Sequence, residues 1–205
     1  MIVIVDYGMG NLGSIANMIH KLGCKSLITA DPQAIMSADK LILPGVGAFD
    51  HGMNNLHQKG LAAALNTRVV EQKTPILGIC LGMQLMGKSS EEGIEKGLGW
   101  IDGGCIKFSF SGDDMKLRIP HMGWNTVNIK KENPLLDNEL EDTRYYFVHS
   151  YHMQCNDPAQ VLATAVYGYE FPCVVWKDNI YGAQFHPEKS HKFGMRLLTH
   201  FIENC

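Results

Sequence analysis

The sequence predicts an α/β domain whose central sheet is parallel in its first part and mixed in the rest, with helices on both sides. Three observations predict it. Short apolar runs alternate with helical spacing through the first half of the chain. Glycine-rich turns follow several of those runs, and the second half is a series of short strand-like runs. No repeat or long linker interrupts the 205 residues, so we expect one three-layer domain over residues 1–205.

The first half is expected to supply the parallel strands. Residues 2–5 form an apolar, β-branched run typical of a strand buried on both faces, and the turn at residues 8–11 ends it. Strands that alternate with helices favour a parallel sheet. The elements expected after this turn are a helix over 14–22, strands over 24–29 and 40–43, a mostly helical segment over 50–70, a strand over 75–79 and a helix over 81–88.

The second half is expected to be antiparallel or mixed. Gly, Asn and Asp residues separate several of its apolar runs, and Lys177-Asp178-Asn179 between two runs predicts a hairpin. Residues 193–202 have the spacing of a closing helix. The strands expected here cover 105–110, 126–129, 145–148, 161–166, 173–176 and 180–185.

Composition excludes several classes of function. The formal net charge is −3 and no run of five basic residues occurs, so we expect no binding to nucleic acid or to a membrane surface. The N-terminal stretch MIVIVDYG has no basic leader, and no apolar segment approaches the roughly 20 residues that span a bilayer. We therefore expect a cytoplasmic protein. Its six dispersed cysteines predict free thiols, with no metal or other cofactor.

Gly78-Ile79-Cys80-Leu81-Gly82 lies between an expected strand and an expected helix. This is the layout of a nucleophile elbow with Cys in place of Ser. A turn this tight strains the central residue, and small residues two positions away let neighbouring backbone approach. The helix N-terminus beyond it favours a thiolate. A buried cysteine that only packs in the core is the alternative reading of Cys80.

A cysteine nucleophile needs a partner for proton transfer, and His186 is the best placed of nine histidines. It follows an apolar strand, and Glu188 comes two residues later, after Pro187. That spacing would let Glu188 orient the imidazole while the imidazole faces Cys80. A surface histidine beside a solvated glutamate is the alternative.

Acyl chemistry also needs donors for a developing oxyanion. Pro44-Gly45-Val46-Gly47 follows another apolar strand and could expose backbone N–H groups beside the elbow. One of these groups, together with the N–H of Leu81, could hold the oxyanion. The glycines would also permit a peptide flip that completes this site when a partner binds. A plain glycine-rich turn is the alternative.

These three pieces, in this order, resemble the class I glutamine amidotransferase family, and the resemblance covers essentially the whole chain. It implies a glutaminase in which Cys80 attacks the side-chain amide of L-glutamine, ammonia leaves, and water hydrolyses the γ-glutamyl thioester. Cys80 would be the nucleophile, His186 the general acid and base, and Glu188 its orienter. The remaining motif matches imply substrate-binding positions at Gly45, Val46, Gly47, Leu81 and Gln84.

Further motifs resemble the subfamily of glutaminase subunits from imidazole glycerol phosphate synthase, an enzyme of histidine biosynthesis. They are residues 6–11 (DYGMGN), 120–125 (PHMGWN), 146–151 (YFVHSY) and 186–190 (HPEKS). The resemblance implies a heterodimer with a (β/α)₈-barrel cyclase that receives the ammonia. It places Asn11, Trp124 and Lys189 at that interface and Tyr146 near the glutamine site.

Two other functions remain compatible with these residues. Close relatives of this subfamily supply ammonia to an amidotransferase of bacterial surface-polysaccharide biosynthesis, and no residue excludes that partner. A binding protein that kept the fold and lost the chemistry is a different class, and the intact Cys80, His186 and Glu188 argue against it. A cysteine peptidase of related architecture would leave Gln84 and the Pro44-Gly45-Val46-Gly47 turn without a role.

Overall fold

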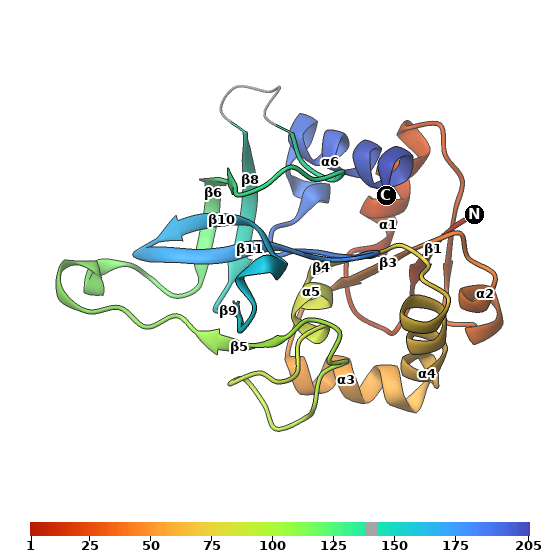
Figure 1. The fold of residues 1–205 in the computed structure, drawn as a ribbon, viewed down its shortest axis with the longest axis horizontal. Helices are drawn as coiled ribbons and strands as arrows, with labels where there is room; N and C mark the ends of the chain where they lie inside the picture. Colours follow the sequence, from red (N-terminus) through yellow and green to blue (C-terminus); the bar gives the residue numbers. More distant parts are fainter. Residues whose placement is uncertain (138–142) are drawn as a thin grey trace.

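A computed structural model describes residues 1–137 and 143–205 of the chain. Within these residues one central sheet has eight strands in the order β2-β1-β3-β4-β12-β11-β10-β7, seen from its edge in Figure 1. Its members are β1 (Ile2–Val5), β2 (Ser26–Thr29), β3 (Lys40–Gly45), β4 (Ile76–Cys80), β7 (Asn128–Ile129), β10 (Val161–Tyr167), β11 (Tyr169–Lys177) and β12 (Ile180–Ala183).

The sheet is parallel on one side and antiparallel on the other. Strands β2, β1, β3, β4 and β12 run parallel to their neighbours. Strands β11, β10 and β7 continue the sheet in antiparallel pairs, and β11 and β12 form the hairpin expected at Lys177-Asp178-Asn179. Two further antiparallel pairs, β5 (Gly103–Lys107) with β9 (Tyr151–Cys155) and β6 (His121–Thr126) with β8 (Arg144–His149), lie beyond it. The predicted fold class is confirmed.

Helices cover both faces of the sheet, because its parallel strands are apolar on both sides. In β1, Ile2 and Ile4 point into one buried cluster, while Val3 and Val5 point into the other. Figure 1 shows α1 and α6 above the sheet and α3 and α4 below it. The helices are α1 (Leu12–Lys21), α2 (Pro32–Met36), α3 (Phe49–Gln58), α4 (Leu61–Asn66), α5 (Leu81–Leu85) and α6 (His191–Asn204).

Several expected elements differ from the structure. The helical segment over 50–70 is broken at Gly60, whose φ of +68° ends α3 before α4 begins, and a π-helical turn η1 (Thr67–Glu71) follows. The helix expected over 81–88 ends at Leu85, because the chain turns where Gly87 approaches the carbonyl of Gly103. Helix α2 and strands β6 and β9 were not predicted from the sequence.

The topology brings three strand ends together at one edge of the sheet. Strand β4 lies between β3 and β12, and the register pairs Gly45 with Cys80 and Ala183 with Ile79. The segments that leave these three strands are therefore neighbours, although they are far apart in the sequence. In open α/β sheets this carboxyl edge is where ligands bind. Among the described residues, no helix has the length and apolar character to cross a bilayer.

Candidate active site

Cys80 stands on the turn between β4 and α5, in a conformation that side chains rarely adopt. Its φ is +52° and its ψ is −109°. Both flanking glycines are needed for this turn. A Cβ on Gly82 would lie 1.7 Å from the carbonyl oxygen of Leu43, and a Cβ on Gly78 would lie 2.8 Å from backbone atoms of Gly82. The neighbouring backbone therefore packs directly on the elbow and holds the thiol at the edge of the sheet.

His186 follows β12 and is paired with Glu188, as the sequence predicts. Its Nδ1 lies 2.8 Å from Glu188 Oε1, and the two side chains are only 1% and 2% exposed. The loop is fixed from both sides, since the His186 N–H donates to the carbonyl of Tyr146 and the Ser190 hydroxyl donates to the carbonyl of His186. A buried carboxylate beside Nδ1 fixes the proton there and leaves Nε2 for the nucleophile.

The environment of His186 favours its protonated form. Burial alone would lower the pKa of the imidazole, but its interactions with Cys80 and then Glu188 outweigh burial and raise the pKa to about 10. Nε2 has no hydrogen-bond partner within the described part of the chain. An imidazolium that is oriented by a carboxylate and lies beside a cysteine can stabilise a thiolate and later donate a proton.

Cys80 and His186 line the same cavity, which has a volume of about 500 Å³. This size suits a small metabolite such as a free amino acid. The cavity collects residues from the ends of β3 and β4, from β8 and β9, and from the loop after α5. The lining residues are Val46, Gly47, Ala48, Cys80, Leu81, Gln84, Glu92, Pro120, Val148, His149, Ser150, Tyr151 and His186.

The Pro44 to Gly47 turn lies beside the elbow, where the sequence analysis placed the oxyanion donors. Gly45 pairs with Cys80 in the sheet, while Val46 and Gly47 line the cavity. Gly47 has a φ of +115°. A Cβ on Gly45 would lie 2.1 Å from the hydroxyl of Tyr7, so only glycine fits there. The Tyr7 hydroxyl is buried and has no hydrogen-bond partner among the described residues.

Glu92 lines the cavity and was not found by sequence reasoning. Its carboxylate accepts a hydrogen bond from the N–H of Phe49 at the start of α3, 2.9 Å away. Asp50 on the same helix accepts from the N–H groups of Ile94 and Glu95, and this fastens the loop that carries Glu92. No local pattern signals this acid, because it follows no strand and belongs to no quoted motif.

The residues expected at a partner interface lie outside the cavity. Trp124 is 43% exposed, and its ring stacks on His191 and meets Tyr146 edge-on. Lys189 Nζ lies 5.7 Å from the centre of the Tyr146 ring. Asn11 is exposed at the N-cap of α1, which packs against the turn that contains Lys189. Tyr146 was expected near the substrate, but its side chain groups with Trp124 and Lys189, and only its backbone supports His186.

Three further histidines are buried, and one of them, His149, lines the cavity. His121 Nδ1 lies 3.1 Å from His149 Nε2, and His149 Nδ1 lies 2.8 Å from the carbonyl of Tyr151. His152 Nε2 lies 2.8 Å from the hydroxyl of Tyr169. Burial lowers the pKa of His121 to about 4 and that of His149 to about 3, so both rings are neutral near pH 7. Their hydrogen bonds indicate a structural role.

Comparison with known proteins gives one consistent result. The chain matches the family described as glutamine amidotransferase class-I over residues 3–205. It is 58% identical to imidazole glycerol phosphate synthase subunit HisH 2 of Methanococcus maripaludis, over 100% of both chains. It is 49% identical to HisH 2 of Pseudomonas aeruginosa, over 99% of each, and 48% identical to HisH of Leptospira borgpetersenii, over 98% of each. A solved glutamine amidotransferase has the same fold, with a TM-score of 0.75, 18% identity and 98% and 97% coverage.

Proposed function

This chain belongs to the class I glutamine amidotransferase family, and from that premise we propose how its residues divide the reaction between them. The chain is a glutaminase, the glutaminase subunit of imidazole glycerol phosphate synthase. It hydrolyses L-glutamine to glutamate and ammonia. The observation that supports the residue roles best is the buried histidine–carboxylate pair beside the strained Cys80 at the edge of a cavity of amino-acid size.

In the first half-reaction the Cys80 thiolate attacks the side-chain amide carbon of glutamine. The carbonyl oxygen takes up negative charge, and the N–H groups of Leu81 and of the Val46–Gly47 turn stabilise it. His186 then gives its Nε2 proton to the amide nitrogen as the C–N bond breaks. Ammonia leaves and a γ-glutamyl thioester remains on Cys80.

In the second half-reaction a water molecule takes the place of ammonia. Neutral His186 accepts a proton from the water as its oxygen attacks the thioester carbonyl. The C–S bond then breaks, glutamate leaves, and the thiolate and imidazolium are restored. Throughout, Glu188 holds the imidazole by Nδ1 and stabilises its positive charge.

Recognition of the substrate is assigned to Glu92, which lines the same cavity. Glutamine carries an α-ammonium group, and the Glu92 carboxylate in the cavity wall is complementary to it in charge. The loop that carries Glu92 is fixed by Asp50, so the carboxylate is held in place before the substrate arrives. Gln84 lies between Glu92 and Cys80 in the sequence and lines the same cavity.

The partner is the cyclase subunit, which we propose is a (β/α)₈ barrel that docks on Asn11, Trp124 and Lys189. Trp124 is a large exposed aromatic side chain that stacks on His191, and such residues are common interface anchors. All six cysteines are free, which suits the reducing cytoplasm as the site of the reaction.

A second partner deserves a test of its own. Two of the relatives named above carry the number 2 in their names, and the Methanococcus maripaludis protein is the most similar of the three. We therefore consider that this chain is a second copy that supplies ammonia to an amidotransferase of surface-polysaccharide biosynthesis. The purified chain would be mixed with the cyclase or with the sugar amidotransferase, and glutamate release would be measured. Stimulation by the cyclase supports the histidine pathway, whereas stimulation by the sugar amidotransferase alone contradicts it.

The nucleophile is tested by Cys80→Ala in the complex with the cyclase. Glutamate release should fall to background while the two subunits still associate, because the thiol is lost and the docking surface is untouched. Cys173→Ala is the matched control, since this fully buried thiol does not line the cavity. A Cys80→Ala complex that releases glutamate at the wild-type rate would contradict the assignment.

A further inference from the structure

Gln184 is a fully buried polar residue that none of the roles above uses. It follows β12 and comes two residues before His186, as the first residue of Gln184-Phe185-His186-Pro187-Glu188. Its side chain has no exposed surface, and its backbone N–H donates to the carbonyl of Cys173. A buried amide is costly unless its donors and acceptors are satisfied, so its partners show what the site requires.

The side-chain amide of Gln184 ends a short chain of hydrogen bonds at the reacting sulfur. Gln84 Nε2 donates to the backbone carbonyl of Tyr151 at 3.0 Å and to Gln184 Oε1 at 3.1 Å. Gln184 Nε2 in turn lies 3.8 Å from Cys80 Sγ, as a donor to sulfur. These contacts join residues about 100 positions apart in the sequence.

The orientation of both amides follows from their partners. The carbonyl of Tyr151 only accepts, so Gln84 must turn its NH₂ group toward it. The same NH₂ group faces Gln184, so Gln184 must present its oxygen to Gln84. The remaining end of the Gln184 amide, its NH₂ group, then faces Cys80. One backbone carbonyl therefore fixes an N–H donor against the sulfur atom.

We propose that Gln184 is a further catalytic residue, whose amide donates a hydrogen bond to the Cys80 sulfur and stabilises its thiolate, and that Gln84 is the positioning residue that holds this amide in its donating orientation. The proposal rests on the glutaminase chemistry assigned above. It gives Gln84 a role besides binding substrate, since both hydrogens of its NH₂ group are already used within the protein.

The reaction benefits from such a donor because the Nε2 atom of His186 has another task. Nε2 must direct its proton to the leaving amide nitrogen and later accept one from water, whereas the amide of Gln184 can donate to the sulfur throughout. In the second half-reaction the sulfur leaves with a full negative charge, and a fixed donor stabilises that charge at no reorganisation cost. Loss of a hydrogen bond to a charged group should therefore lower the thiolate population about 10-fold.

The test measures Cys80 directly and needs neither glutamine nor a partner. The full chain is treated with iodoacetamide, and alkylation of the Cys80 peptide is followed by mass spectrometry over a range of pH. Gln184→Met should alkylate about 10-fold more slowly than wild type at pH 7 and recover at higher pH. Gln84→Met should slow the reaction less, about 3-fold, because the amide is still present but free to turn.

Gln160→Met is the matched control. Gln160 is also buried and its amide is hydrogen-bonded, to the N–H of Asp102 and the carboxylate of Asp157, but it lies outside the cavity. In the Gln160→Met variant, Cys80 should be alkylated at the same rate as in wild type at every pH. If Gln184→Met does not fold, Gln84→Met decides the question. Alkylation of the folded variants at the wild-type rate and pH profile would overturn the proposal. That result would leave the assignment of the chain as a glutaminase unchanged, because glutamine hydrolysis is measured separately.

Discussion

Among the residues that the structure describes, two histidine–carboxylate pairs occupy different surroundings. His186 Nδ1 lies 2.8 Å from Glu188 Oε1 at the edge of the sheet, and His200 Nε2 lies 3.1 Å from Asp137 Oδ2 against α6. The distances are similar, but the neighbours are not. Glu188 is almost fully buried and faces His186, whereas Asp137 is 24% exposed and also binds Arg196.

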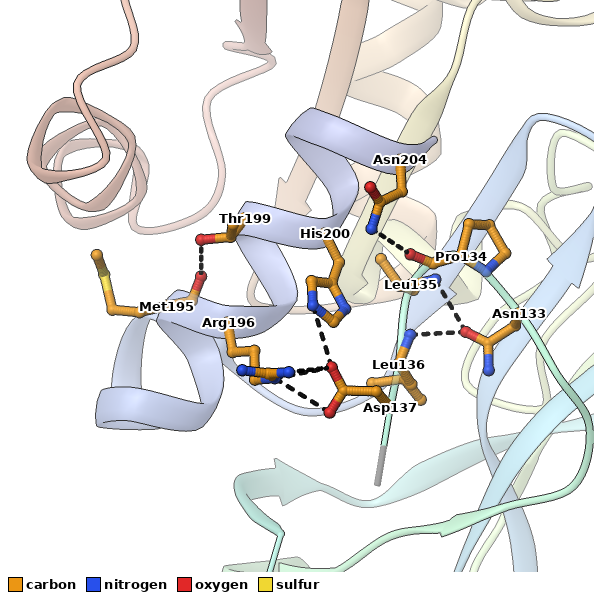
Figure 2. A network of polar contacts seen from close by, with 10 residues as sticks. All are labelled: Asn133, Pro134, Leu135, Leu136, Asp137, Met195, Arg196, Thr199, His200 and Asn204. Carbon is orange, nitrogen blue, oxygen red and sulfur yellow. Dashed lines mark hydrogen bonds and ion pairs between the residues drawn. The ribbon is translucent and has the colours of Figure 1, made fainter. Parts of the chain in front are cut away.

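The second pair fastens a surface segment to α6. Figure 2 shows Asp137 between His200 and Arg196, and both carboxylate oxygens accept from Arg196 Nε, at 3.0 and 2.7 Å. Just before it, Asn133 Oδ1 accepts from the N–H groups of Leu135 and Leu136, which turns the chain toward the helix. The guanidinium neutralises the carboxylate, as an ion pair at the rim of a small cavity.

The difference shows what suits the His186–Glu188 pair to the catalytic role that we propose for it. In the pair at the sheet edge, the second nitrogen of the imidazole is left for a thiol, and no competing cation binds the carboxylate within the described part of the chain. In the pair on α6, the carboxylate is shared with Arg196, and the described residues that line the cavity beside His200 include no cysteine. The two pairs differ in the burial of the carboxylate and in the group beside the pair, which is a thiol in one case and a guanidinium in the other. The histidine–carboxylate distance does not distinguish them.

The largest expected effect separates the pairs by activity. Glu188→Gln keeps the shape but removes the charge that orients and stabilises the His186 imidazolium, so glutamate release should fall by about 10²–10⁴-fold. Asp137→Asn, the matched change in the other pair, should leave glutamate release within about 2-fold of wild type. Both variants would be assayed in the complex with the cyclase. Equal losses in the two variants would show that the comparison is wrong.

A second prediction concerns His121 and His149, which pair with no carboxylate among the residues that the structure describes. Burial lowers the folded-state pKa of His149 to about 3 and of His121 to about 4, below the ordinary value near 6.5. The unfolded chain therefore binds more protons below pH 6.5, so their contribution to stability is complete above that pH and is lost as the pH falls. Between pH 7 and pH 5 the free energy of unfolding should decrease by about 2–4 kcal/mol.

Urea unfolding of wild type and of His149→Asn at both pH values would check this. The variant should be less stable at pH 7 and should lose less stability on acidification, because one of the groups that resist protonation is gone. The same loss between pH 7 and pH 5 in both proteins would mean that these histidines do not control the acid sensitivity.

The smallest effect concerns the pair on α6. Asp137→Asn should lower the free energy of unfolding by about 1 kcal/mol, because a partly exposed ion pair contributes little even with two-point geometry. Urea unfolding at pH 7 would measure it, with Lys130→Gln as a control for loss of an exposed surface pair. A loss of several kcal/mol would contradict this prediction and show that residues 133–137, which pack against α6, contribute more to the core.

The arrangement of Cys80, His186 and Glu188 could be predicted from the sequence because its signals are local, and its catalytic role is our proposal. A cysteine between two glycines after an apolar run defines the elbow, and a His-x-Glu spacing defines its partner. Gln184, Glu92 and Tyr7 could not be assigned in this way. Their contacts join segments 40 to 100 residues apart, and only the pairing of β3, β4 and β12 brings those segments together.

The fold was also predictable in part. The buried parallel strands are continuous apolar runs, so β1, β3 and β4 were found at nearly their observed bounds. Strand β6 was missed because Gly123 and polar residues interrupt its pattern, and β9 was missed because His152 and Gln154 are polar. Helix α2 has five residues and no room for a periodic pattern, although its Asp31-Pro32 start is a local signal.

The most direct test of the triad is to trap its covalent intermediate. The complex with the cyclase would be mixed with glutamine, quenched rapidly in acid and digested, and the cysteine peptides would be examined by mass spectrometry. The account predicts a γ-glutamyl group on Cys80 and on no other cysteine, with none on the Cys80→Ala protein. A γ-glutamyl group on a different cysteine, or glutamate release by Cys80→Ala, would contradict it.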